Sequence, residues 1–148
     1  MVNQNITNAD FDNALYLLNK YDIDVVVHIM VGLPNETHED IVNIVNYLNK
    51  KEIQGIKIHS TYVLKDTILA QLYLNGEYNA LSLEEYVEEV VYILTHIKES
   101  IIIHRITGDP PKDMLIAPLC SNSKKKVLNS ITKIFKEQKI KQGIYKNK

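Results

Sequence analysis

The stretch HIMVGLPNET, His28–Thr37, decides how the chain is expected to fold. It joins an apolar run, Val25–Val31, to a tight turn and then to a helix. The glycine and proline of the turn end the predicted strand, and Thr37 with Asp40 three residues later has the pattern of a capping box. In parallel α/β proteins, ligands sit at such strand ends, where backbone N–H groups converge on a helix N-terminus.

The same unit of strand, turn and helix repeats along the chain. We expect strands at residues 25–31, 56–63 and 101–106, a short helix after Thr67, and longer helices beginning near Asn8, Thr37, Ser82 and Ser123. The first strand is apolar at nearly every position, which predicts burial on both faces. The last helix, reaching about Gln138, is expected to bury Val127, Leu128, Ile131, Ile134 and Phe135.

This alternation predicts an α/β fold with parallel strands and right-handed crossovers. The 148 residues are too few for an eight-fold α/β barrel of about 250 residues. Three or four parallel strands cannot close a barrel, and an open sheet edge must be paired, covered or swapped. We therefore expect part of a barrel, organised as a single domain over residues 1–148.

Composition narrows the classes of function. The net charge of −1 gives no electrostatic support for nucleic acid or an acidic membrane surface, and the lysine-rich tail after Lys124 is expected to be a solvated helix face. No apolar run approaches 18 residues and no signal-peptide pattern is present, which predicts a cytoplasmic protein without a membrane partner. Cys120 is the only cysteine, so disulfides and metal sites with several thiolates are excluded, and we assign this thiol no role.

Each predicted strand carries a histidine after three strand-forming residues: His28, His59 and His104. Side chains alternate along a strand, so all three could face the barrel interior, with His28 and His104 in one layer and His59 between layers. Three readings stay open. The histidines could line a substrate or cofactor cavity, be hydrogen-bonded core residues, or bind a metal such as zinc in a metal-dependent hydrolase.

Lys57, Arg105 and Asp109 are further candidates. Lys57 has the same parity as His59, so it either points inward and needs an acidic partner or lies solvated at an edge. Arg105 suits a carboxylate or phosphate, and Asp109 suits a hydroxyl or amine. Alternatively, Arg105 and Asp109 pair with each other and stiffen a loop that already holds two prolines.

Several stretches together resemble one family: His28–Thr37, Gly55–Lys65 with Thr67, His104–Asp109 with Leu115–Pro118, and Gln142–Gly143. They are similar to the carboxyl-terminal half of bacterial radical S-adenosylmethionine (SAM) proteins related to the Elongator catalytic subunit. The resemblance implies the C-terminal portion of a partial (β/α)6 barrel. Full-length members hold a [4Fe-4S] cluster that reductively cleaves SAM to a 5′-deoxyadenosyl radical.

The resemblance also implies roles for particular residues. The strand end near Pro34 would pack close to the SAM adenine, which places His28, Met30, Gly32, Leu33 and Pro34 on the SAM side. The substrate-side candidates are Lys57, His59, His104, Arg105 and Asp109. Family analogy alone raises RNA as a substrate, and no residue is assigned as catalytic.

The cluster-binding cysteines of the family, spaced C-x3-C-x2-C, are missing from these 148 residues. We therefore expect no cofactor and no metal on this chain alone, and no activity without a partner. The expected partner is an N-terminal half, as a separate chain or a missing segment, or a second copy that covers the open sheet edge. The alternative functions are a non-catalytic half-barrel or remnant that oligomerises, and the histidine-based hydrolase.

Overall fold

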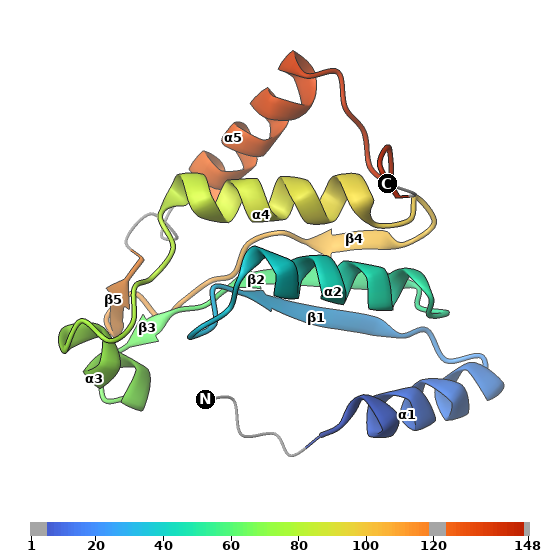
Figure 1. Ribbon diagram of the computed structural model, residues 1–148, viewed down its shortest axis with the longest axis horizontal. Coiled ribbons are helices and arrows are strands. Elements are labelled where there is room, and N and C mark those ends of the chain that lie inside the picture. The colour runs from blue at the N-terminus through green and yellow to red at the C-terminus, as the bar shows by residue number, and fades with distance from the viewer. Residues whose placement is uncertain (1–5, 119–123, 147–148) are drawn as a thin grey trace.

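The structure, a computed structural model, describes residues 6–118 and 124–146. In chain order the elements are α1 Asn8–Lys20, β1 Val26–Val31, α2 His38–Asn49, β2 Gly55–Ser60, β3 Val63–Leu64, α3 Ile68–Leu74, α4 Leu83–His96, β4 Ile102–Arg105, β5 Leu115–Ala117 and α5 Lys124–Glu137 (Figure 1). The start predicted for the last helix, Ser123, lies outside the described residues. In the described part, every helix is too short or too polar to cross a membrane.

The main sheet is parallel and has the strand order β1-β2-β4. β1 and β2 run in uninterrupted register, from Val26 opposite Gly55 to Val31 opposite Ser60. β4 pairs with the other side of β2, with a shift in register between Ile56 and Lys57. Helices α2 and α4 follow β1 and β2, so the predicted α/β class with parallel pairing is confirmed.

Only one face of this sheet is covered by helices. Ile29 and Val31 of β1 and Ile58 of β2 are buried in one core with residues of α2 and α4. His28 and Met30, which alternate with them along β1, point to the other face and are exposed. The expected burial of β1 on both faces is therefore wrong, because the side chains on its second face, His28 and Met30, are exposed. We call this second face the open face.

Local hydrogen bonds fix where the long helices begin. The predicted capping box of Thr37 and Asp40 starts α2, and Ser82, the predicted start of the next long helix, forms a capping box with Glu85 that starts α4. Helix α1 has a third box, in which Thr7 rather than Asn8 is the N-cap residue. Hydrogen bonds from the cap residues lower the pKa of Asp40 and Glu85, which keeps these carboxylates charged at the positive end of each helix.

The predicted strand over residues 56–63 is divided in two. β2 ends at Ser60, and the Thr61 N–H donates to the carbonyl of Val31 at 2.9 Å. The chain then leaves the parallel sheet, and β3 pairs antiparallel with β5. With α3, this ribbon forms a small second core around Val63, Ala70, Tyr78 and Ala117. It lies beyond the end of the sheet where β2 stops (Figure 1).

Helix α5 packs on the outer side of α4 (Figure 1). It buries Val127 and Ile131, as predicted, but Leu128 is 44% exposed. After α5, the side-chain amide of Gln142 donates to the carbonyls of Lys98 (2.9 Å) and Ile101 (2.7 Å). These bonds hold the C-terminal segment against the loop between α4 and β4.

Candidate functional site

The open face carries a row of three basic side chains across the sheet. His28 of β1 is the register partner of Lys57 of β2, and Lys57 is the partner of Arg105 of β4. Register partners in a sheet point to the same face, and neighbouring strands lie about 4.8 Å apart. We call His28, Lys57 and Arg105 the basic row. The predicted candidates from three strands are therefore brought together on one surface.

His59 lies one step along β2 from this row, opposite Met30. Its ring stacks on that of His28, with 5.4 Å between the ring centroids and 21° between the planes. Burial lowers the pKa of His59, and the nearby groups of His28, Arg105 and Lys57 lower it further. Its Nε2 atom is buried and has no hydrogen-bond partner within residues 6–118 and 124–146. His59 thus places an imidazole nitrogen without a partner beside the basic row.

His104 does not join the other two histidines. The register shift takes β4 from Ile103 directly to Arg105, so His104 has no partner of its own on β2. Its ring lies over Gly55 at the start of β2, where a Cβ on Gly55 would come within 2.5 Å of the ring. The expectation that His28 and His104 share a layer is therefore wrong. In the described ranges, no three His, Cys, Asp or Glu side chains are placed to hold a metal ion.

Asp109 is engaged by a different cation from the one expected. Its carboxylate forms an ion pair with Lys124 at the start of α5, which lowers the pKa of Asp109 below its ordinary range. Within the described residues, Arg105 forms no such pair, so the expected Arg105–Asp109 contact is not made. Arg105 stays exposed at the end of β4, and its charge acts on the Asp109 carboxylate only from a longer distance, where it adds to the lowering of the pKa of Asp109.

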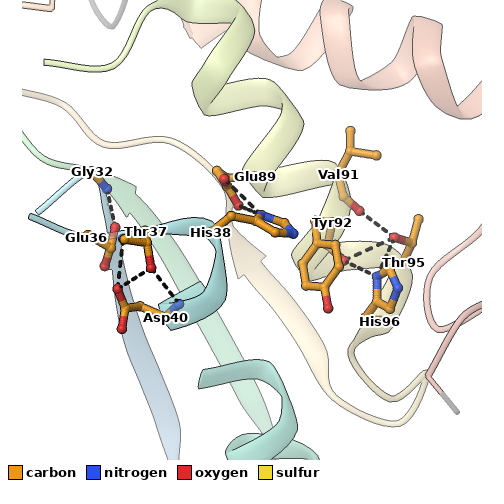
Figure 2. A network of polar contacts seen from close by, with 10 residues as sticks. All are labelled: Gly32, Glu36, Thr37, His38, Asp40, Glu89, Val91, Tyr92, Thr95 and His96. Atoms are coloured by element: carbon orange, nitrogen blue, oxygen red, sulfur yellow. Dashed lines mark hydrogen bonds and ion pairs between the residues drawn. The ribbon is translucent and has the colours of Figure 1, made fainter. Parts of the chain in front are cut away.

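The turn after β1 is closed by its own side chains. The carboxylate of Glu36 accepts hydrogen bonds from the N–H groups of Gly32 (2.6 Å) and Leu33 (3.3 Å). The Tyr78 hydroxyl donates to the Gly32 carbonyl at 2.5 Å, and Gly32 itself has a φ of +87°. Figure 2 shows Glu36 reaching back to Gly32 beside the capping box of Thr37 and Asp40. The amides expected to face a ligand are therefore already occupied.

Burial also shifts the pKa values of two side chains at this turn, Glu36 and Tyr78. It raises the pKa of Glu36, against the two N–H bonds that lower it. Burial likewise raises the pKa of Tyr78 to about 12, so this hydroxyl stays a hydrogen-bond donor at neutral pH. Sequence reasoning missed both residues. The spacing from Gly32 to Glu36 was visible, whereas nothing local indicates that Tyr78, from a segment 46 residues away, would reach Gly32.

The ends of β2 and β4 are packed. Tyr62 lies against Gly108, and the Tyr86 hydroxyl donates to the carbonyl of Ile106 at 3.0 Å. The space left between these side chains is about 10 Å³, which suits a single water molecule. A larger ligand must therefore approach the open face itself rather than enter between these strand ends.

A second, much larger hollow of about 710 Å³ lies beside β1, whose outer edge has no partner strand among the described residues; we call it the free edge. Phe11 and Tyr47 line it on the helix side, and His28, Met30 and His59 line it on the side of the open face. Helix α1 borders this hollow and is tied to α2 and the residues just after it. Asp12 accepts from the hydroxyl of Tyr47 in α2 at 2.6 Å and pairs with Lys51, beyond the end of α2, at 2.5 Å. The hollow thus connects the unpaired edge of the sheet with the predicted SAM-side residues.

Comparison with known proteins identifies the family. Residues 53–137 match the model of the radical SAM C-terminal domain, and the chain belongs to this family. Over 126 residues it is 36% identical to the uncharacterized protein YtqA of Bacillus subtilis, covering 85% of this chain and 39% of YtqA. It is 29% identical over 136 residues to MJ0486 of Methanocaldococcus jannaschii, covering 91% of this chain and 42% of that protein. The chain thus spans about two fifths of the length of these relatives.

A solved structure supports the fold. The archaeal Elp3 of Methanocaldococcus infernus superposes with a TM-score of 0.81 at 19% identity, covering 95% of this chain and 33% of that chain. The resemblance drawn from the sequence motifs is therefore confirmed at the level of the family. Membership implies SAM and a [4Fe-4S] cluster for full-length members of the family.

Proposed function

We propose that this chain forms the C-terminal part of a radical SAM enzyme, corresponding to the last strands of a partial (β/α)6 barrel. The observation that carries the proposal is the half-covered sheet: helices pack on one face, while the other presents polar and basic side chains from three strands. In a closed or nearly closed barrel, such a face lines the interior.

The cluster does not fit this chain alone. Three thiolates are needed to hold a [4Fe-4S] cluster that leaves one iron for SAM, and the sequence has one cysteine, Cys120, which lies outside the described residues. All three cluster ligands must therefore come from an N-terminal half, on the same polypeptide or on another. The free edge of β1 and the hollow beside it are the place for its adjoining strand.

In this arrangement the chain lines the space for SAM and the substrate, and the other half generates the radical. Because the amides of Gly32 and Leu33 are bound by Glu36, contact with SAM falls to exposed side chains, His28 and Met30, and to the apolar surface of Leu33 and Pro34. The substrate would meet Lys57, His59 and Arg105 on the same face. His104 and Asp109 lie at its margins, held by contacts with Gly55 and Lys124.

The test is an anaerobic assay of 5′-deoxyadenosine formation from SAM. We expect product from this chain combined with a cysteine-bearing N-terminal half supplied as a separate polypeptide, and none from either part alone. A variant of that half with its three cluster cysteines changed to alanine is the control and should be inactive. Cluster formation and SAM cleavage by the 148-residue chain alone would overturn the proposal.

A second candidate is a non-catalytic half-barrel that self-associates. It rests on exposed apolar side chains of the open face, Ile102 at 61% and Met30 at 39%. Sedimentation analysis separates the two functions. A stable dimer that binds neither SAM nor the cysteine-bearing half would favour this candidate, whereas displacement of the dimer by that half would favour the enzyme. The hydrolase receives no support, because the three histidines do not gather at one point.

A further inference from the structure

The basic row places two permanent cations side by side. Lys57 and Arg105 are register partners on adjacent strands, and His28 continues the row on β1. Like charges directly opposite one another destabilise a sheet. Such a pairing is costly unless a counter-charge lies between the two side chains.

In its described part the chain supplies no direct ion-pair partner for these two cations, and Asp109 interacts with Arg105 only from a longer distance. Neither Lys57 nor Arg105 forms an ion pair within residues 6–118 and 124–146. The acids at this end of the sheet are used elsewhere: Asp109 binds Lys124, and Glu36 binds the amides of its own turn. The neighbouring His59 adds an imidazole nitrogen without a partner rather than a negative group.

We propose that Lys57 and Arg105, flanked by His28, bind a phosphate monoester on the open face. Two fixed positive charges match the charge of about −1.5 to −2 that such a group carries at pH 7. The planar guanidinium can donate two parallel hydrogen bonds to phosphate oxygens, and the Lys57 ammonium contributes a compact positive charge. The proposal rests on the proposed function only in naming the ligand as part of the substrate.

The first test uses inorganic phosphate and this chain alone, followed by nuclear magnetic resonance of the histidine rings. We expect a saturable change at the His28 and His59 rings and a rise in the pKa of His59, because the bound anion offsets the neighbouring cations. Lys57→Gln and Arg105→Gln should each weaken phosphate binding about tenfold. Lys136→Gln, which removes an exposed cation of α5, is the matched control and should bind as the wild type does.

The melting temperature, measured with and without phosphate, is a second test. It separates loss of phosphate binding from misfolding of a variant. Without phosphate, Lys57→Gln should raise the melting temperature, since it relieves the repulsion from Arg105. With phosphate, the wild type should gain stability and Lys57→Gln should not. Lys57→Arg keeps the charge and should keep the gain.

Acetate and dimethyl phosphate each carry a single negative charge. They test whether the site prefers a phosphate monoester to other anions. We expect both to bind at least about tenfold more weakly than phosphate. Equal binding of either one, or equal loss in Lys136→Gln, would overturn the proposal. Phosphate binding is measured independently of 5′-deoxyadenosine formation. A failure to bind phosphate would not contradict the proposed function, and a failure to form 5′-deoxyadenosine would not contradict phosphate binding.

Discussion

Single side chains determine the shape of the open face. Gly55 is the clearest case, because the His104 ring occupies the space where any other residue would place a Cβ, and the Ile102 carbonyl lies 2.9 Å from the same point. A glycine at the start of β2 therefore allows His104 to fold over the strand. The strand pattern around Gly55 predicts β structure, but it contains no information on which ring from β4 lies above it.

Gly55→Ala should lower the free energy of unfolding by about 1–3 kcal/mol, the usual cost of adding a methyl group where no space exists. In the background His104→Ala the cost should fall but not vanish, because the backbone carbonyl of Ile102 does not move away with the ring. Urea denaturation of the four proteins measures this coupling. An unchanged cost in the His104→Ala background would show that the ring does not lie over Gly55.

Glu36 should give the turn after β1 a distinctive dependence on pH. Because burial raises its pKa above the ordinary 4.5, this group stabilises the fold fully below about pH 4.5 and progressively less as pH rises through its folded-state pKa. Glu36→Gln cannot ionise, so its free energy of unfolding should improve relative to the wild type between about pH 4 and pH 7.

Glu36→Ala should be less stable than the wild type by about 1–3 kcal/mol, since the two N–H groups lose their acceptor. Glu88→Ala on the exposed side of α4 is the control and should stay within about 0.5 kcal/mol. Chemical denaturation across this pH range checks both variants. A Glu36→Gln curve parallel to that of the wild type would contradict the assigned environment of Glu36.

Helices and strands differ in how far sequence predicts them here. The capping boxes of α2 and α4 are made by residues three positions apart, so their motifs are visible locally and both are correct. The end of β2 depends instead on contacts with Val31 and on β5, more than 50 residues later. The strand-forming residues at 56–63 therefore predict one strand where the structure has two.

Helix α5 tests the assignment of its buried face. Ile131→Ala should lower the free energy of unfolding by about 2–4 kcal/mol, because it opens a cavity against α4. Leu128→Ala, at a side chain that is 44% exposed, should cost less than half as much. Urea denaturation compares the two directly, and equal costs would mean that α5 is rotated from the orientation described.

In the described part of the molecule, the main sheet of an α/β fold is covered by helices on one face only. The fold class and the family of the chain can be read from the sequence, because strand–turn–helix repeats and several short motifs together specify them. The candidate site was predictable only in part. Alternation of side chains along a strand predicts that Lys57 and His59 share a face. The pairing of Lys57 with Arg105 depends instead on a register shift that no local sequence pattern predicts.

The most direct measurement is hydrogen exchange of this chain with and without its cysteine-bearing half. We expect new protection in the amides of β1 and around the basic row, because a strand of that half should pair with the free edge and cover the open face. The amides of α5, on the far side of α4, should exchange as before. Binding that protects α5 while leaving β1 unchanged, or no binding at all, would contradict the central claim that this sheet is completed by the radical-generating half.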